Sequence, residues 1–154
     1  MSRPLRDALG RWATGVVIVT GRDGNGAHYG MTVNSFASVS LDPALVLWSI
    51  QRSCEYADVF ESGYCVSVLG EHQSDMVWQF TQGDQNERFA GVETRELTSG
   101  RRALAGALAY FDCDLHQRVV AGDHDVLIGQ VTEFDTQDGQ PVLFNQGQLG
   151  KVAV

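Results

Sequence analysis

The segment of the chain best suited to chemistry is residues 32–40, which read Thr-Val-Asn-Ser-Phe-Ala-Ser-Val-Ser. It is dense in small hydrogen-bonding side chains within an otherwise apolar region. One interpretation is a strand with one solvated polar face. The other is a ledge of donors and acceptors that holds a planar polar heterocycle, since a few placed polar groups orient a ligand in an apolar site. The residues with that chemistry are Thr32, Asn34, Ser35 and Ser38.

A second segment, Gly122-Asp123-His124-Asp125, combines turn-forming residues with a histidine. The simpler interpretation is a tight turn between two strands. A turn at the rim of a barrel would also present His124 to a ligand, because barrel mouths are common binding sites. Residue types alone leave both interpretations open.

The chain lacks the spacings that metal sites and hydrolases use. None of the four histidines pairs at i, i+4 with another ligand type, so no metal site is expected. Neither a GxSxG elbow nor a glycine-rich phosphate loop is present, which favours a binding module or a cofactor enzyme. The three cysteines form no CxxC pair. Two of them, Cys65 and Cys113, lie in apolar runs and are expected in the core.

Composition predicts one globular domain over residues 1–154. Hydrophobic residues make up 44% and charged residues 19%, which suits a chain with a real core. The net charge of −8 argues against nucleic acid as a partner. No apolar run approaches the roughly 20 residues of a membrane span, and no secretory signal is visible. We therefore expect no membrane association and a cytoplasmic location.

Short strands and a few short helices must position these residues, because 17 glycines indicate many turns. Apolar and β-branched runs predict strands over residues 16–20, 28–33, 36–41, 45–50, 64–69, 111–116, 126–134 and 142–144. The last two are expected to pair across the Asp138-Gly139 turn. Helical spacing predicts helices near residues 5–12, 56–60 and 76–80, the second N-capped by Ser53. Residues 81–102 are polar and weakly patterned.

These elements predict a mainly β fold with about eight strands and two or three short helices. No strand–helix–strand rhythm repeats, which argues against a doubly wound parallel sheet. An antiparallel barrel with helical insertions fits better, because closing a sheet removes its exposed edges.

The run from Gly30 to Pro43 closely resembles the signature of the flavin reductase-like domain family. Further matches follow in order over nearly the whole chain. Residues 13–17 resemble the family's N-terminal strand, Arg88-Phe89 its mid-chain pair, residues 122–124 its Gly-Asp-His turn, and residues 141–147 its C-terminal hairpin. The resemblance implies the FMN-binding split barrel, an antiparallel split β-barrel, as a single domain over residues 1–154.

The resemblance also implies where the ligands bind. Thr32, Asn34, Ser35 and Ser38 would line the isoalloxazine ring and ribityl chain, and His124 would position a nicotinamide as the catalytic residue. Ser49, Arg52 and Ser53 would hold the flavin phosphate before a short helix. The full set of implied cofactor-binding residues is Thr32, Val33, Asn34, Ser35, Ser38, Val39, Ser49, Arg52, Ser53, Arg88 and Phe89.

The implied activity is reduction of FMN or FAD by NADH or NADPH, with transfer of the reduced flavin to a partner monooxygenase. The resemblance further implies a homodimer. A non-catalytic flavin-binding or storage protein of the same fold is the main alternative. An oxidase of a phosphorylated amine such as pyridoxamine phosphate is disfavoured, because Lys151 is the only lysine. An unrelated small-ligand barrel is the remaining alternative.

Overall fold

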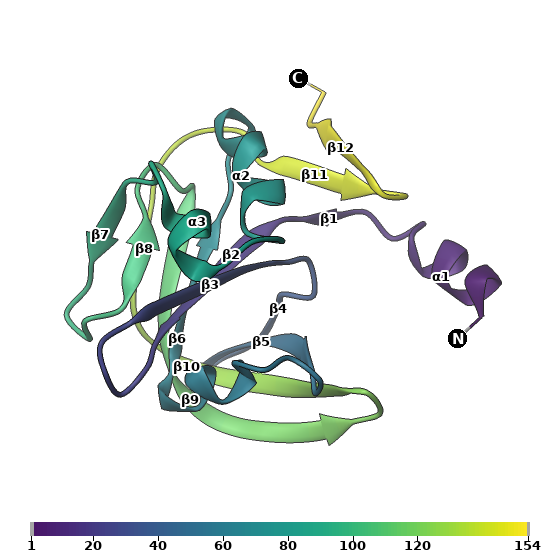
Figure 1. The fold of residues 1–154 in the computed structure, drawn as a ribbon. Coiled ribbons are helices and arrows are strands. Elements are labelled where there is room, and N and C mark those ends of the chain that lie inside the picture. The colour runs from purple at the N-terminus through teal and green to yellow at the C-terminus, as the bar shows by residue number, and fades with distance from the viewer. Residues whose placement is uncertain (1, 154) are drawn as a thin grey trace.

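A computed structural model describes residues 2–153, and about half of them lie in antiparallel β-sheets (Figure 1). The largest sheet has seven strands in the order β3-β2-β6-β9-β10-β5-β4. Its strands are β2 (Val17–Arg22), β3 (His28–Val33), β4 (Ala37–Leu41), β5 (Ala44–Gln51), β6 (Tyr64–Val68), β9 (Ala109–Ala121) and β10 (His124–Thr136). Its two edge strands, β3 and β4, are joined by three residues, so the sheet bends round and brings its edges close together. The mainly β, antiparallel fold expected from the sequence is confirmed.

Two smaller sheets complete the strand set. One contains β1 (Thr14–Gly15), β11 (Val142–Asn145) and β12 (Gln148–Lys151), and the other contains β7 (Thr94–Glu96) and β8 (Arg102–Leu104). The first of these sheets lies beside α2 at the upper end of the molecule in Figure 1.

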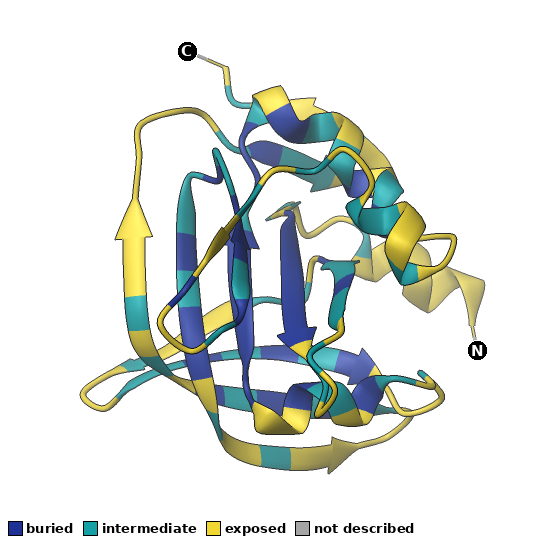
Figure 2. Cartoon of the chain, turned by 60° about the vertical axis from the view of Figure 1, so that its left-hand side comes forward, coloured by how far each residue is buried: buried dark blue, intermediate teal, exposed yellow. Residues whose placement is uncertain are grey.

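The helices are short. They are α1 (Arg3–Leu9), α2 (Ser74–Gln79) and α3 (Gln85–Phe89), with two 3₁₀ turns, η1 (Ala57–Ser62) and η2 (Glu71–Gln73). Helix α1 has no buried residue and extends away from the sheets (Figures 1 and 2). Within residues 2–153 no helix has the length and apolar character needed to cross a bilayer.

The main core lies between the large sheet and η1, where Figure 2 shows the strands to be buried. Trp48 meets Phe60 and Tyr64 edge-on, with ring centroids 5.0 and 5.6 Å apart. The Tyr64 hydroxyl donates a hydrogen bond of 3.0 Å to the carbonyl of Leu127. A Cβ at Gly129 would collide with that hydroxyl, so only glycine allows β10 to approach Tyr64 this closely. The core therefore joins β5, β6, β10 and η1.

Cys65 and Cys113 are fully buried, as predicted from their apolar surroundings. Burial raises the pKa of the Cys113 thiol to about 12 and that of Cys65 further still. Both thiols stay protonated at neutral pH and act as small core residues.

The strand predicted for residues 111–116 carries a buried carboxylate, that of Asp112. Asp112 is buried and accepts a 2.7 Å hydrogen bond from Nε of Arg101, which is also buried. Nη1 of Arg101 donates to the Ser62 carbonyl at 3.0 Å. This pair attaches the loop between β7 and β8 to the large sheet, because a buried charge is tolerated only when it is paired and hydrogen-bonded.

The predicted pairing of residues 126–134 with residues 142–144 is wrong. Strand β10 lies between β9 and β5, so both of its edges are already hydrogen-bonded. Strand β11 instead pairs with β1 and β12. The sequence suggested a hairpin because the two runs are neighbours in the chain, but β10 satisfies its backbone groups in the large sheet.

One other local prediction also needs correction. Ser53 does not cap a helix, since the following turn is the 3₁₀ segment η1, which begins at Ala57 after Tyr56 and has no side-chain cap. Residues 81–102, in which the sequence is polar and weakly patterned, contain α3 and β7. Asp84 caps α3 by accepting from the backbone N–H of Glu87 at 2.9 Å. These elements are too short to show a hydrophobic period.

Candidate functional site

A cleft of about 560 Å³ opens where β3 and β5 end beside the start of β10. Three parts of the chain that are remote in sequence therefore form its walls. Its lining residues are Met31, Thr32, Val33, Asn34, Ser35, Ser49, Ile50, Gln51, Ser53, Cys54, Glu55, Tyr56 and His124. The sequence singled out residues 32–40 and 122–125, and the structure brings together part of each in the cleft, residues 32–35 and His124.

Ser35 and Ser49 connect the two sides of the cleft. The Ser35 hydroxyl accepts a 2.9 Å hydrogen bond from the Ser49 backbone N–H and lies 3.2 Å from the Ser49 carbonyl, to which it donates. These contacts join the segment after β3 to the end of β5. The short side chain of Ser35 therefore sets the local width of the cleft as well as contributing polarity.

The hydroxyl of Thr32 has a structural partner. It donates to the carbonyl of Val77 on α2 at 2.7 Å, and the Thr32 backbone N–H donates to the Phe80 carbonyl at 3.2 Å. Among residues 2–153 no side-chain hydrogen bond of Asn34 is found, so its amide is the polar group of this segment that a ligand can engage fully. The ledge of donors and acceptors inferred from the sequence is centred on Asn34 and Ser35.

His124 begins β10 immediately after the turn from β9. The turn between two strands predicted for residues 122–125 is confirmed. Nδ1 of His124 lies 2.7 Å from Oδ1 of Asp123, and the ring lines the cleft. The hydrogen bond and charge of His124 lower the pKa of the Asp123 carboxyl. Because Nδ1 is engaged, Nε2 is the ring nitrogen that can meet a ligand.

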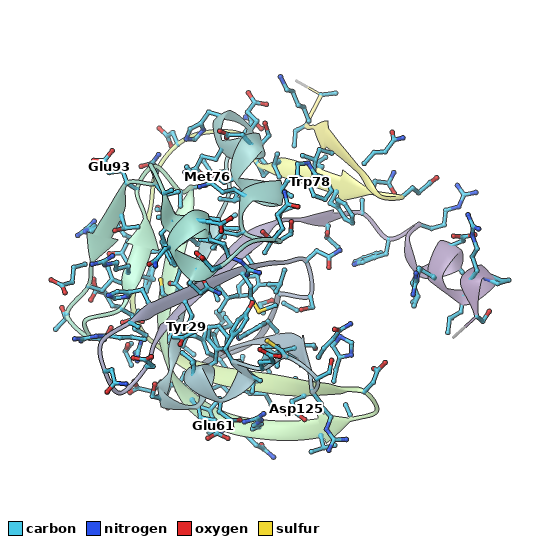
Figure 3. The ribbon with its side chains drawn as sticks, viewed as in Figure 1. Tyr29, Glu61, Met76, Trp78, Glu93 and Asp125 are labelled. Carbon is cyan, nitrogen blue, oxygen red and sulfur yellow. The ribbon has the colours of Figure 1, made fainter. Side chains whose placement is uncertain are left out.

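Asp125, the residue after His124, connects the turn between β9 and β10 to η1 through Arg118. Asp125 has a side chain only 6% exposed, and its Oδ2 accepts from Arg118 Nε at 2.9 Å. Arg118 also pairs with Asp58 and Glu61 of η1. Figure 3 labels Asp125 and Glu61 along the lower side of the molecule. The network therefore connects the turn that carries His124 to η1, the segment that directly follows cleft residues 53–56.

Arg52, expected at the flavin phosphate, does not line the cleft. Its Nη1 donates to the Gly122 carbonyl at 3.4 Å, and its Nε lies 3.8 Å from Oδ1 of Asp125. Its backbone N–H donates to the Asp123 carbonyl at 3.0 Å. The guanidinium thus lies against the turn that carries His124.

Ser38, Val39 and Phe89 also lie outside the cleft lining. Ser38 and Val39 are exposed on the edge strand β4. Phe89 packs edge-on against Phe80, with ring centroids 5.1 Å apart, and faces Gly30. Phe89 therefore packs against β3 at Gly30, outside the cleft lining.

Tyr56 lines the cleft although sequence reasoning assigned it only to a helix. Its hydroxyl accepts a 2.9 Å hydrogen bond from Nη1 of Arg88, which also donates to the Gly30 carbonyl at 2.8 Å. Arg88 therefore does not line the cleft itself but contacts Tyr56, which does. The signal that could have found Tyr56 was its position three residues after Ser53, on the segment already expected to meet the ligand.

The chemistry of the lining fits a flavin. Short hydroxyl and amide groups can meet the carbonyl and nitrogen edge of an isoalloxazine ring, and Met31, Val33 and Ile50 can pack against its apolar surface. The cleft volume lies within the usual range of roughly 300–1,000 Å³ for small-molecule sites. Residues that could hold the ring are Asn34 and Ser35, with Ser49 and Ser53 at the other wall.

The family model of the flavin reductase like domain matches residues 9–153, and the chain belongs to this family. The resemblance inferred from the sequence is confirmed. The chain is 38% identical to the FMN reductase (NADH) SmoA of Agrobacterium fabrum, over 97% of this chain and 86% of that protein. It is also 38% identical to the flavin-dependent monooxygenase reductase subunit HsaB of Rhodococcus jostii, over 95% and 75%.

The fold is similar to that of the NADH:FAD oxidoreductase SgcE6 of Streptomyces globisporus, solved with NAD and FAD fragments. The TM-score is 0.90 at 30% identity, covering 97% of this chain and 91% of that one. The chain spans less than half the length of some other curated relatives.

Proposed function

We propose that this protein is an NAD(P)H:flavin oxidoreductase that reduces FMN or FAD and passes the reduced flavin to a monooxygenase. The observation that carries the proposal is the meeting of Asn34, Ser35 and His124 in one cleft, in a chain of the flavin reductase family. The proposal includes the FMN-binding split barrel as the fold of the chain, with the cleft at the opening between β3 and β5.

A bound flavin would supply the two-electron chemistry, with reduced nicotinamide as the hydride donor. The chain's own residues bind and orient. The Asn34 amide would donate a hydrogen bond to the polar edge of the ring, where negative charge develops on reduction. The Ser35 hydroxyl, whose proton is directed to the Ser49 carbonyl, would accept one from the ring. His124, held by Asp123, positions the nicotinamide and transfers no proton, because hydride transfer to N5 needs no prior protonation. Of the other implied residues, Arg52 would support the turn that carries His124 and Phe89 would support β3 at Gly30, whereas Ser38 and Val39 are exposed on β4.

A storage protein of the same fold remains the second candidate function. What favours the enzyme is the hydrogen bond between Asp123 and His124, because holding one histidine orientation serves alignment of a second ligand. Flavin storage alone gives no role to a ring fixed in this way at the cleft wall.

The deciding experiment mixes purified protein with FMN or FAD and then adds NADH or NADPH without oxygen. All four combinations should be compared as steady-state rates and as bleaching of flavin absorbance. Flavin binding followed by bleaching supports the reductase. Binding without bleaching under any combination supports storage, and no binding of either flavin removes both candidates.

A separate experiment tests whether the protein delivers reduced flavin to a partner monooxygenase. The names of HsaB and other relatives describe reductase components of monooxygenases, which supports release of reduced flavin to an oxygenase. A reductase that supplies a partner should turn over excess flavin many times per protein molecule. Retention of one flavin per chain through many turnovers would argue against delivery.

The protein is further proposed to be a cytoplasmic homodimer. Leu5, Leu9 and Trp12 are exposed on and after α1, and Leu41 is 96% exposed on the edge strand β4. Exposed apolar side chains at a sheet edge and an unpacked helix favour burial against a second copy. Light scattering during size exclusion gives the mass in solution, and a mass of one chain at micromolar concentration would overturn the dimer.

A further inference from the structure

The carboxylate of Asp125 is buried directly beside His124 in the chain. Successive side chains of a strand point to opposite faces, so Asp125 points away from the face that His124 presents to the cleft. The Asp125 side chain is 6% exposed, and within the described residues its Oδ1 accepts no hydrogen bond. A carboxylate loses its hydration on burial, so it needs charged or hydrogen-bonding partners. The partners of Asp125 therefore show which parts of the fold it holds in place.

Arg118 on β9 is the main partner of Asp125. Its Nε and Nη2 lie 2.9 and 2.8 Å from Oδ2 of Asp125. Its remaining nitrogen, Nη1, donates to Oδ1 of Asp58 at 3.0 Å and to the carboxylate of Glu61. Both of these acidic residues belong to η1, and Glu61 and Asp125 lie along the same side of the molecule in Figure 3. Arg118 therefore connects the carboxylate beside His124 to η1.

Arg52 is the second arginine at this carboxylate. Its Nε lies 3.8 Å from Oδ1 of Asp125, the oxygen that Arg118 does not contact. The backbone N–H of Arg52 donates to the Asp123 carbonyl at 3.0 Å. Arg52 immediately precedes cleft residues 53–56, which we call the wall segment. The side chain and the backbone of Arg52 therefore both connect the start of the wall segment to the turn.

One carboxylate thus holds both ends of the wall segment. Arg52 holds the start of the segment, and η1, which directly follows it, is held through Arg118. His124, the chain neighbour of that carboxylate, lines the same cleft as the wall segment. Desolvation offsets much of the attraction within a buried ion pair, so such a pair is weak evidence for stability. The geometry that Asp125 fixes is the better account of its burial at this position.

We propose that Asp125 is a positioning residue for hydride transfer, because its carboxylate fixes the distance between His124 and the wall segment. This rests on the proposed flavin-reducing function, in which His124 positions the nicotinamide, and adds a residue that touches neither ligand. Arg118 shares the role, since it holds the carboxylate and η1 together. A small displacement at a reacting centre costs more in rate than in affinity, so the rate is the quantity that Asp125 protects.

Hydrogen exchange of the flavin-free protein tests the positioning role without measuring activity. The probe is the backbone amide of Arg52, whose hydrogen bond to Asp123 joins the wall segment to the turn. Asp125→Asn keeps the size of the side chain and removes its charge, and it should speed exchange of this amide about tenfold. Amides of β6, which lies between β2 and β9, correct for any change in global stability. Unchanged exchange at Arg52 relative to β6 would overturn the proposal.

Anaerobic stopped-flow measures the consequence for the reaction. At saturating FMN and NADH, Asp125→Asn should bleach flavin about tenfold more slowly than wild type, with the Kd of FMN changed less than about twofold. The matched control is Asp112→Asn, because Asp112 is also a buried aspartate paired with an arginine and lies outside the cleft lining. That variant should lose stability but keep wild-type bleaching and wild-type relative exchange at Arg52. A merely structural Asp125 would behave like Asp112.

Variants of Arg118 test whether the two residues act as one unit. Arg118→Met leaves a buried carboxylate without its main partner, so the double variant Asp125→Asn/Arg118→Met, which removes both charges, retains the test if Arg118→Met does not fold. The double variant should bleach no more than about twofold more slowly than Asp125→Asn alone. Losses that multiply instead would contradict a joint role. Thermal melting shows which single variants are folded.

Wild-type behaviour separates failure of this proposal from failure of the proposed function. If wild type bleaches with NADH and Asp125→Asn bleaches at the same rate, only the role of Asp125 is lost. If wild type binds no flavin, or binds it without bleaching, the proposed function itself is lost. The exchange experiment on the flavin-free protein then still decides whether Asp125 holds the turn against the wall segment.

Discussion

His124 Nδ1 lies 2.7 Å from Oδ1 of Asp123, so the histidine is held by the residue that precedes it in the same turn. Both side chains are at the start of a long hairpin whose strands continue into the centre of the large sheet. The local hydrogen bond favours one orientation of the ring at the cleft wall, with the His124 side chain 38% exposed. The remaining ring nitrogen is then available to a second ligand.

Replacing His124 by alanine is expected to impair the binding or positioning of the nicotinamide and to leave the affinity for flavin nearly unchanged. Loss of a contact made only in the transition state lowers kcat and kcat/KM together, whereas loss of uniform binding raises KM alone. Anaerobic stopped-flow bleaching at saturating flavin, over a range of NADH, separates the two. The flavin Kd should change less than twofold. Wild-type bleaching at every NADH concentration would remove His124 from the site.

Asn34→Ala and Ser35→Ala are both expected to weaken flavin binding, by about 1 kcal/mol for each lost hydrogen bond. Only Ser35→Ala should also lower stability, because its hydroxyl joins β5 through Ser49. Flavin titration and urea unfolding measure the two effects on the same samples. Unchanged flavin affinity in both variants would show that this ledge does not contact the flavin.

Ser53→Ala is expected to weaken FMN and FAD more than riboflavin while leaving the free energy of unfolding unchanged. Ser53 lines the cleft but caps no helix, so the usual loss of about 1 kcal/mol for removing a cap should not appear. Three flavin titrations and one thermal melt are sufficient. The same loss for all three flavins would place the phosphate elsewhere.

The stability of the protein should fall between pH 7 and pH 5, partly through His28. Burial, together with the charges of Arg102 and Arg22, lowers the pKa of His28 below its usual value of 6.5. Below pH 6.5 the unfolded chain therefore takes up a proton that the folded chain refuses, so unfolding becomes easier as the pH drops.

His28→Gln should make that decline in Tm shallower. Parallel Tm curves for wild type and His28→Gln would contradict the prediction.

Gly129→Ala should destabilise the protein by roughly 1–3 kcal/mol, the usual cost of forcing extra atoms into a packed core. The new Cβ would meet the Tyr64 hydroxyl and lie 2.8 Å from Cβ of Cys113. Gly150→Ala on β12 is the control, because nothing lies within 4 Å of that position. Urea midpoints of the two variants that agree within error would show that β10 can shift away from Tyr64.

The sequence by itself determined the local elements that carry a strong period and the segments that carry chemistry. Strands β2, β3 and β5, the buried state of Cys65 and Cys113, and the turn before His124 all follow from runs of apolar residues broken by turn residues. Residues 32–35 and His124 could be singled out because short polar groups and a histidine stand out in such surroundings. The ordered family motifs then connected them to one ligand.

Only the tertiary structure decided which of those residues share a cleft. Arg52 and Ser53 are adjacent in the sequence, yet Ser53 lines the cleft and Arg52 lies against Gly122 and Asp125. The partner of β10 could not be read from chain order either, because strands β9 and β5 compete with β11 for the same backbone groups. The Arg88–Tyr56 contact spans 32 residues. Contacts of that kind depend on how the large sheet bends, and the bending of the sheet cannot be predicted from a local pattern of residues.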